Sequence, residues 1–444
     1  MTVSRTICLG FLAVITAGAL LLMMPFSTID GTWSDPITAL FTSTSAVCVT
    51  GLSVVDVGKY YSFWGQLCLV LLVQIGGLGY MTATTFLLLL LGRRFGLKDK
   101  IALQQSLDKS GLAGVVQLVQ SILATTILFE LTGVFLLMLV FVPESGFKDG
   151  LWSAIFHSVN SFNNAGFSIY SDNLIRYVNS PLINFTVSGL IIFGGIGYQV
   201  IMEMYLWLRD RFNKSHICTV FSLNFKVVTS TTAFLLILGT IAYLVLEYNN
   251  PGTFGPLNFP QKVMAAWFQS VTPRTAGFNT IDISQMSEAS LFMTIVLMFI
   301  GASPGSTGGG IKTTTFRILF SCTAAVLEDQ EQVQCYQRQI PPAMILKTIS
   351  VVFGSLLVAI TSATLIELAN PELEFIQVLF EAVSAFGTVG LSTGITAKIS
   401  AIGKLVLIAT MYIGRVGVLL LMSAAVGDPK PRTFKYAEES LLVG

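Results

Sequence analysis

The chain has 444 residues, of which 53% are apolar and 11% are charged, with a formal net charge of +1 and a mean hydropathy of +0.75. Soluble domains carry about 25% charged residues, so this composition excludes an ordinary soluble protein. The near-neutral charge also argues against a nucleic-acid partner. We therefore expect a multi-pass membrane protein.

Eight apolar runs are long enough to cross a bilayer, which takes about 20 residues of helix. The first run is too long for the apolar region of a cleaved signal peptide, so we expect it to be retained as a span. An N-terminus on the cytoplasmic side places most of the 25 basic residues in inner loops, which predicts that both termini are cytoplasmic. The runs are residues 6–24, 63–91, 115–142, 181–208, 224–246, 288–326 (interrupted), 342–368 and 401–426.

A short segment patterned like a helix lies between the two spans of each successive pair. These segments are too short and too polar to cross the membrane, so they predict re-entrant half-helices, at residues 35–47, 150–162, 260–271 and 374–386. Each pair of spans returns the chain to the side it started from, so all the units have one orientation. The negative C-terminal ends of the half-helices should point toward a common axis and favour a cation there.

The predicted fold class is an all-α membrane protein with four parallel membrane–pore-loop–membrane repeats, giving eight transmembrane helices and four re-entrant pore helices around a pseudo-fourfold pore. The expected repeats are residues 1–95, 112–210, 222–327 and 342–427, followed by a cytoplasmic tail at 428–444. Their pore loops are expected at residues 35–52, 150–168, 260–279 and 374–392.

A glycine closes each half-helix, at Gly51, Gly166, Gly277 and Gly390, with intervals of 115, 111 and 113 residues. A glycine there lets the backbone turn through positive φ and bring carbonyl oxygens close to the axis. Each glycine could instead be a simple helix C-cap. The shared period favours a ring of carbonyl oxygens that replaces the hydration shell of an ion.

Second-span glycines at the next level of the bundle, Gly76, Gly77, Gly79, Gly194, Gly195 and Gly197, are expected to allow close packing of helices. Arg274 lies beside the third glycine loop and would repel a cation. We expect its guanidinium to face away and to hold the loop from behind. Four polar residues are expected to brace the second loop in the same way, namely His157, Asn160, Asn163 and Asn164.

The second span of the third repeat is interrupted by residues 301–312, which contain five glycines and a proline. About 13 residues of apolar helix precede this segment, which places it roughly halfway across the bilayer. Non-helical backbone at that depth must line a water-filled path or be packed in protein, so we expect a flexible loop on the permeation path. A phosphate-binding loop is the competing interpretation, but the segment follows a membrane helix rather than a strand.

Arg415 lies within the last span, about 22 Å from the cytoplasmic basic cluster at helical rise, which is too far for its side chain to reach the surface. A charge inside the membrane is costly and usually faces a polar interior. Near the axis it would raise the barrier to cations. The alternative is a structural pairing with Glu130 or Glu203.

These motifs together resemble the Trk/Ktr/HKT superfamily of potassium transporters over nearly the whole chain. The resemblance rests on residues 42–52 (TSTSAVCVTGL), 156–168 (FHSVNSFNNAGFS), 270–280 (SVTPRTAGFNT) and 380–394 (FEAVSAFGTVGLSTG). Eight spans without two additional N-terminal helices look like the Ktr-type membrane subunit. In this superfamily a serine at the first filter position favours sodium, so Gly51 implies potassium conduction.

The resemblance implies an ion selectivity filter in which backbone carbonyls bind potassium. Its residues would be Cys48, Val49, Thr50, Gly51, Asn163, Asn164, Ala165, Gly166, Thr275, Ala276, Gly277, Gly387, Thr388, Val389 and Gly390. It also implies a gate formed by the loop and the arginine. The gate residues would be Gly301, Ala302, Ser303, Pro304, Gly305, Ser306, Thr307, Gly308, Gly309, Gly310, Lys312 and Arg415.

Further expectations follow from the same resemblance. Potassium would be the substrate, sodium a coupling or activating ion, and the cytoplasmic (inner) membrane the location. The subunit would form a homodimer and carry a cytosolic nucleotide-binding regulatory ring of RCK/KTN type, because we find no dinucleotide-binding motif in this chain.

Two other functions remain as alternatives. An alternating-access symporter coupled to sodium or protons would show inverted repeats, which the parallel pattern does not favour. A membrane enzyme would need a cluster of catalytic side chains, and the two histidines, His157 and His216, are far apart in sequence. The six cysteines form no C-x-x-C pair, so neither a disulfide framework nor a zinc site is indicated.

Overall fold

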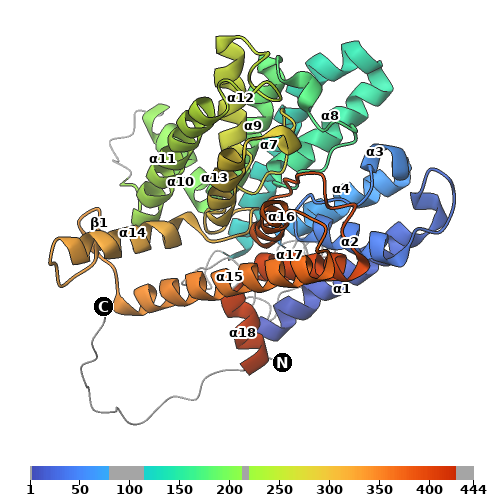
Figure 1. The fold of residues 1–444 in the computed structure, drawn as a ribbon. Helices are drawn as coiled ribbons and strands as arrows, with labels where there is room; N and C mark the ends of the chain where they lie inside the picture. Colours follow the sequence, from blue (N-terminus) through green and yellow to red (C-terminus); the bar gives the residue numbers. More distant parts are fainter. Residues whose placement is uncertain (1–2, 80–114, 213–219, 427–444) are drawn as a thin grey trace.

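The computed structural model describes residues 3–79, 115–212 and 220–426, and these are mostly helical (Figure 1). The predicted tail at 428–444 and the end of the second predicted span, residues 80–91, lie outside the described residues. The strands β1 (Gln334–Cys335) and β2 (Arg338–Gln339) form a small antiparallel hairpin after α14.

The helices follow one another in four groups, each with a long helix, a short helix and further helices in that order. The first group is α1 (Val3–Met23), α2 (Pro36–Val47), α3 (Val57–Tyr60) and α4 (Phe63–Leu78). The second is α7 (Val115–Ser145), α8 (Phe147–Phe162), α9 (Pro181–Ile196) and α10 (Tyr198–Phe212). The third is α11 (Leu223–Leu246), α12 (Phe259–Val271), α13 (Glu288–Phe299) and α14 (Thr313–Leu327). The fourth is α15 (Pro342–Ala369), α16 (Phe375–Gly387), α17 (Ala401–Val416) and α18 (Val418–Val426). Single-turn 3-10 helices lie at Pro25–Ser27, Ile175–Tyr177 and Ile283–Gln285.

The short helices α2, α8, α12 and α16 lie where the half-helices were predicted. The Asp35 side chain caps α2 by accepting a hydrogen bond from the backbone of Thr38, and Asn258 forms a capping box with Gln261 at the start of α12. The second half of α2 is buried, including its threonines and serines. These helices therefore point polar, buried C-terminal ends into the protein.

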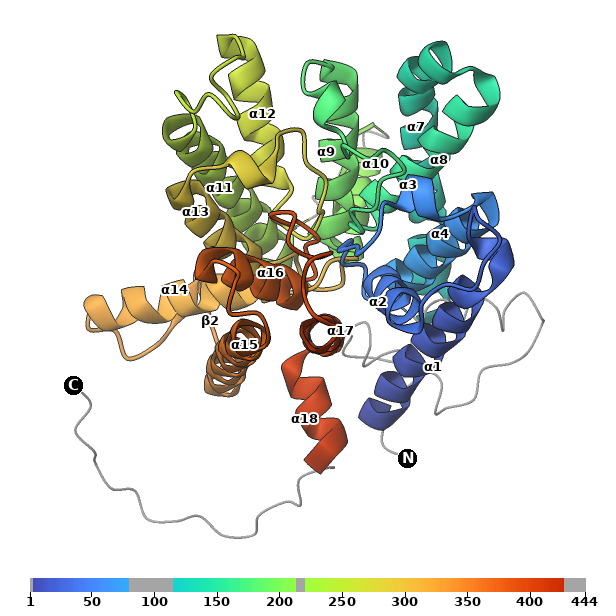
Figure 2. The ribbon, with the colours of Figure 1, turned by 45° about the vertical axis from the view of Figure 1, so that its right-hand side comes forward.

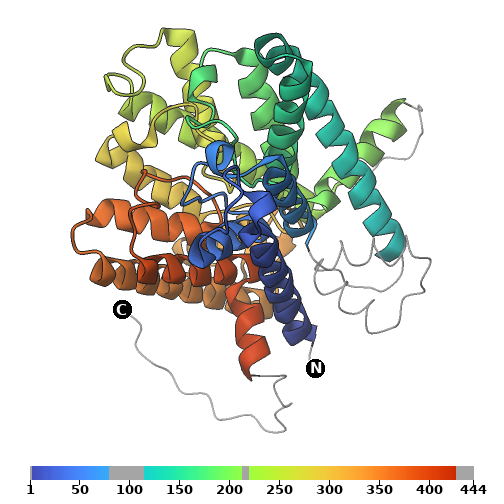
Figure 3. The same cartoon turned by 90° about the vertical axis from the view of Figure 1, so that its right-hand side faces the viewer.

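Each short helix packs against the long helix before it and against a helix of a neighbouring group. Thus α8 contacts α4, α12 contacts α9, α16 contacts α13, and α2 contacts α17. The last of these contacts joins the end of the chain to its beginning, and the four groups lie around a common centre in Figure 2. Figure 3 shows α1 beside α18, where the hydroxyls of Ser4 and Ser423 are 3.1 Å apart.

Among the described residues, four helices are long and apolar enough to cross a membrane, namely α1, α7, α11 and α15, and the number rises to six if two bent pairs each count as one span. The predicted spans at 181–208 and 401–426 are each a bent pair of helices in the structure. The α9–α10 pair bends by 104° and the α17–α18 pair by 95°. Gly197 and Gly417 adopt φ of 95° and 90° at these breaks, and positive φ ends a right-handed helix.

Candidate functional site

The four glycines at the ends of the pore loops lie next to one another in a closed ring. A Cβ added to Gly51 would lie 3.0 Å from the Cα of Gly166, and one added to Gly166 would lie 2.9 Å from the Cα of Gly277. A Cβ added to Gly277 would lie 3.1 Å from the Cα of Gly390, and one added to Gly390 would lie 3.1 Å from the Cα of Gly51. No side chain fits between these backbones, so the ring requires glycine.

Backbone carbonyl oxygens occupy the same ring. The oxygen that would meet each added Cβ belongs to the residue preceding the next glycine in the ring; these residues are Ala165, Ala276, Val389 and Thr50. The ring is therefore built from main-chain atoms of all four groups, with no charged side chain among its residues. Neutral carbonyl oxygens are suitable ligands for a weakly hydrated monovalent cation.

The backbone conformation alternates in the same way at all four ring segments. The glycines have φ of 90°, 71°, 75° and 90°, and the residue two positions earlier is also left-handed, at Val49 (57°), Asn164 (59°), Thr275 (71°) and Thr388 (50°). Positive φ is a strained conformation for β-branched residues. The sequence analysis anticipated positive φ at the glycines but missed these four positions, because three of them are valine or threonine.

Hydrogen bonds from the short helices hold the ring segments from behind. The N–H groups of Thr50, Ala165 and Val389 donate to the carbonyls of Ser45, Asn160 and Ser384 at 2.7, 2.8 and 2.8 Å. The Ser45 and Ser384 hydroxyls also accept hydrogen bonds from the ring glycines, at 3.0 Å from Gly51 and 3.1 Å from Gly390. These bonds fix the strained backbone to the short helix that precedes it and hold the carbonyl oxygens in position.

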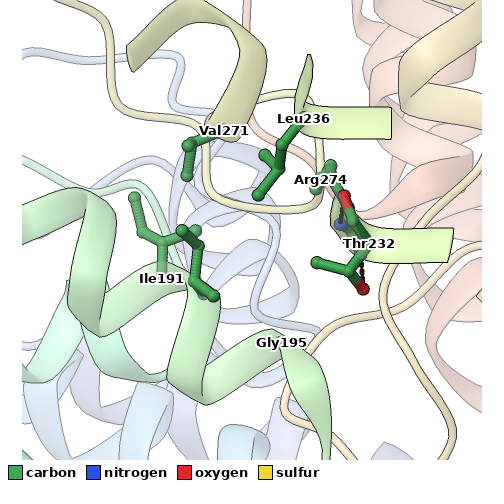
Figure 4. Close-up of a pocket in the computed structure, with 7 residues that line it drawn as sticks. Ile191, Gly195, Thr232, Leu236, Val271 and Arg274 are labelled. Atoms are coloured by element: carbon green, nitrogen blue, oxygen red, sulfur yellow. Dashed lines mark hydrogen bonds between the residues drawn. The ribbon is translucent and has the colours of Figure 1, made fainter. Parts of the chain in front are cut away.

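Arg274 faces away from the ring, as expected. Its guanidinium donates to Thr232 on α11, at 3.5 Å to the carbonyl and 3.3 Å to the hydroxyl. Figure 4 shows this side chain beside a cavity of about 10 Å³ whose lining includes Ile191 and Leu236, with room for about one water molecule. Arg274 also lines this cavity, and its buried Nε has no hydrogen-bond partner among the described residues. The arginine therefore supports the third segment from the rear.

The polar residues of the second segment have the bracing contacts expected of them. The two ring nitrogens of His157 lie 2.8 Å from the Ser153 carbonyl and 2.9 Å from the Ser168 hydroxyl. Asn160 donates to the Phe156 carbonyl at 2.8 Å. Asn163 donates to Gln74 and Glu130, and Asn164 reaches the carbonyls of Ser161 and Ile191 when its amide nitrogen faces them.

The loop between α13 and α14, residues 301–312, lies directly against the ring. A Cβ on Gly308 would meet the Thr275 hydroxyl, and a Cβ on Gly309 would meet the Thr388 hydroxyl. Ala302, Ser303 and Thr307 are fully buried. The loop therefore closes one side of the ring, and its glycines permit the close approach.

Hydrogen bonds link the loop to itself and to a neighbouring helix in the conformation that the structure shows. Gly301 donates to the Ile311 carbonyl at 2.9 Å, and the Ser303 and Thr313 hydroxyls are 2.9 Å apart. Bonds to α9 hold the other side, where Ser303 N–H donates to the Gly195 carbonyl at 3.0 Å and Thr307 N–H to the Gly194 carbonyl at 3.2 Å. Two loop glycines have positive φ, Gly305 (67°) and Gly310 (68°). The hydrogen bonds of the loop hold its backbone in this conformation.

The remaining loop residues complete this network. Pro304 and Gly305 contribute carbonyls near the α9–α10 break, where Gly305 accepts from Tyr198 N–H at 3.1 Å. Ser306 donates to the Ser303 carbonyl at 2.7 Å, and the Lys312 ammonium donates to the Gly308 carbonyl at 2.8 Å.

Arg415 connects the loop to the opposite side of the ring. Its guanidinium donates to the carbonyls of Thr307 in the loop and of Gly76 on α4, with a longer bond of 3.4 Å to Gly77. The alternative pairing with Glu130 or Glu203 is not found, because these carboxylates accept from Asn163 and from Ser222 instead. The pair Gly414 and Arg415 in the fourth group corresponds to the pair Gly76 and Gly77 in the first group. Arg415 therefore occupies the position that a glycine, Gly77, has in the first group.

The packing role expected of the second-span glycines holds for part of the set. Gly76, Gly194 and Gly414 face the final carbonyls of α2, α8 and α16. At Gly79 no described residue lies within 4 Å of an added Cβ, and its φ is 79°, a conformation that ends α4. The recurring spacing of three residues, at 76 and 79, 194 and 197, and 414 and 417, was the signal in the sequence for these helix ends.

The fold and the ring together define a multi-pass helical membrane protein with a ring of main-chain carbonyl oxygens at its centre and a hydrogen-bonded loop against it. The TrkH family, described as cation transport protein, matches residues 6–436, and the chain belongs to this family.

Two similar proteins are named Ktr system potassium uptake protein B. The one from Vibrio alginolyticus is 39% identical over 99% of this chain and 94% of its own length, and the one from Bacillus subtilis (strain 168) is 39% identical over 94% and 92%. The potassium/sodium uptake protein NtpJ from Enterococcus hirae is 36% identical over 99% and 97%. The crystal structure of the potassium transporter TrkH from Vibrio parahaemolyticus has a TM-score of 0.73 at 16% identity, covering 95% of this chain and 84% of that one, which supports the fold.

Proposed function

We propose that this chain is the translocating subunit of a potassium uptake system of Ktr type. The observation that carries the proposal is the closed ring of four glycines, with a carbonyl oxygen between each neighbouring pair. Four fused membrane–pore-loop–membrane repeats form a pseudo-fourfold, channel-like pore around this ring. The names of the relatives, which refer to potassium uptake, support potassium as the substrate.

The selectivity filter consists of four segments that each end at a ring glycine. The segments begin at Cys48, Asn163, Thr275 and Gly387. Potassium exchanges its water shell for carbonyl oxygens there. The ion then passes the loop at 301–312 and reaches the cytosol, where both termini lie. The membrane potential drives the movement with about 2.3 kcal/mol per charge per 100 mV.

The loop and Arg415 form the gate. Gly308 and Gly309 block the exit from the ring, and the guanidinium of Arg415 holds the loop to α4 while placing a positive charge below the filter. Sodium activates or couples the flux, and the subunit works as a homodimer in the cytoplasmic (inner) membrane. A cytosolic nucleotide-binding ring of RCK/KTN type regulates it, and the word "system" in the names of the relatives supports a partner.

The test is uptake of ⁸⁶Rb⁺ or K⁺ by a bacterial strain that lacks its own potassium uptake, expressing this chain with and without a Ktr-type regulatory subunit at two sodium concentrations. We expect growth and uptake to be restored by the pair and increased by sodium. Absence of uptake under every condition, with the protein shown to be in the membrane, would contradict potassium transport. Restored uptake at the same rate at both sodium concentrations would contradict only the sodium dependence.

Replacement of Arg415 by alanine is expected to raise basal uptake several-fold. Each hydrogen bond from a charged group contributes about 1.5–3 kcal/mol, and the loss of these bonds frees the loop from α4. Arg415→Lys keeps the charge but cannot bridge both carbonyls with the planar geometry of a guanidinium. Low flux in Arg415→Lys would assign the barrier to charge, and high flux would assign it to the bridge. Low flux in Arg415→Ala, with normal membrane insertion and folding, would contradict the gate role.

A further inference from the structure

A second cavity lies beyond the gating loop, away from the ring. It measures about 510 Å³ and is enclosed by the loop, the first turn of α14, the N-terminal half of α15 and the α17–α18 break. It reaches Gly305 and Gly310 of the loop on one side and the exposed residues Met344 and Lys347 on the other. The cavity therefore connects the loop to the surface of the protein.

The polar part of the lining is cationic. Lys312 and Lys347 both contribute to it, together with hydroxyl groups from Thr314, Thr315 and Thr348, and no acidic residue is found among the described residues that line it. The ion pairs in the described part of the chain involve other groups, so neither ammonium is neutralised by a carboxylate there. Two lysine side chains without a carboxylate partner among the described residues make this cavity unsuitable as a cation site and complementary to an anion.

The other part of the lining is apolar. Ile318, Val351, Val418 and Leu420 contribute to it. On α15, one of the helices suited to crossing a membrane, large apolar residues outside the cavity lining are exposed, with Leu346 at 67% and Phe353 at 69%. A free anion would leave this apolar lining unused. A lipid phosphate with its acyl chain fits both halves.

We propose that this cavity binds an anionic phospholipid. Its phosphate lies between the ammonium groups of Lys312 and Lys347, and an acyl chain follows the apolar side along α15 and α18. The lipid comes from the leaflet that the N-terminal end of α15 contacts.

The site has a direct connection to the loop, and this part of the inference rests on the proposed function. The Lys312 ammonium donates to the Gly308 carbonyl, and Gly308 lies against Thr275 of the ring. A phosphate competes with that carbonyl for the same ammonium. Bound lipid therefore loosens Gly308 and favours the open loop.

Binding is measured on the purified full-length chain in neutral detergent by native mass spectrometry, with dioctanoyl phosphatidylglycerol as the probe. Dioctanoyl phosphatidylcholine and inorganic phosphate are added separately as competitors. Lys347→Gln is the test variant because this lysine lies outside the loop and its side chain is exposed. Lys226→Gln on α11 is the matched control, since Lys226 is exposed and does not line the cavity.

We expect Lys347→Gln to weaken phosphatidylglycerol binding about fivefold, the effect of removing one basic residue near an anionic lipid, and Lys226→Gln to leave binding unchanged. Neither competitor should displace the probe at equal concentration. Equal affinity in Lys347→Gln and Lys226→Gln would overturn the site, and displacement by inorganic phosphate would overturn the lipid as its occupant. Because this readout does not involve transport, it stands or fails separately from the uptake assay.

In vesicles, phosphatidylglycerol should increase ⁸⁶Rb⁺ flux of the unmodified chain above that in phosphatidylcholine alone.

Discussion

The Gly51→Ser variant is expected to lose most of its preference for potassium over sodium, by on the order of tenfold, the effect of about 1.4 kcal/mol. A Cβ at this position would overlap the Ala165 carbonyl oxygen, so the ring must widen or rotate at this contact. The backbone at Gly51 has φ of 90°, and an L-residue forced into a left-handed conformation costs about 1–2 kcal/mol. Both effects should displace the carbonyl oxygens that we propose replace the hydration shell of potassium.

The measurement is competitive uptake of ⁸⁶Rb⁺ against sodium in proteoliposomes. Gly31→Ser is the matched control, because Gly31 also has positive φ, 64°, but none of the residues that the structure describes lies within 4 Å of an added Cβ. This control carries the backbone penalty without the ring contact, so it should keep the selectivity of the unmodified chain. Unchanged relative uptake of the two ions in Gly51→Ser would show that Gly51 is not part of the filter.

Deletion of Gly308–Gly310 is expected to raise ion flux on the order of tenfold, since a net hydrogen bond contributes about 1 kcal/mol and several bonds hold the closed loop. The deletion removes the backbone that lies against Thr275 and Thr388. It also removes the carbonyl of Gly309, which accepts from Ala302 N–H at 3.3 Å, and the carbonyl of Gly308, which accepts from Lys312. The exit from the ring should then stay open in the absence of any regulatory subunit.

The comparison protein for this experiment is a deletion of Asp329–Glu331, three exposed residues in the turn after α14. This control deletion removes three residues from the same group of helices but none that contact the ring. Ion flux through the control variant should therefore match that of the unmodified chain. Flux through both deletion variants is read as ⁸⁶Rb⁺ uptake normalised to folded protein in the membrane. Reduced flux in the Gly308–Gly310 deletion, with normal insertion, would contradict the gate assignment.

Much of the local structure was available from the sequence because it depends on neighbouring residues. The predicted half-helices end at Val47, Phe162 and Val271 as observed, and the fourth extends one residue further, to Gly387. Their helical pattern and the glycine that follows each of them are local signals. The apolar runs likewise gave α1, α7, α11 and α15, since the length needed to cross a bilayer is a property of a single segment.

The tertiary structure decided which of these local features meet. The positive φ of Val49, Thr275 and Thr388 opposes the preference of β-branched residues, and it persists because bonds from the pore helices and contacts with the neighbouring segments hold it. Arg415 could have paired with Glu130 on sequence grounds. Only the folded chain brings the Thr307 and Gly76 carbonyls, from two other helix groups, within reach of its guanidinium.

The sequence by itself therefore determined the membrane class, the four similar segments and the glycines that permit a close backbone ring, because hydrophobicity and φ preference belong to single residues and short segments. The tertiary structure alone decided the closure of the ring from Gly390 to Gly51 and the bonds that hold the loop to α9 and to Arg415. These features depend on contacts between residues more than 100 positions apart, such as Thr307 and Arg415, and no local pattern encodes such contacts.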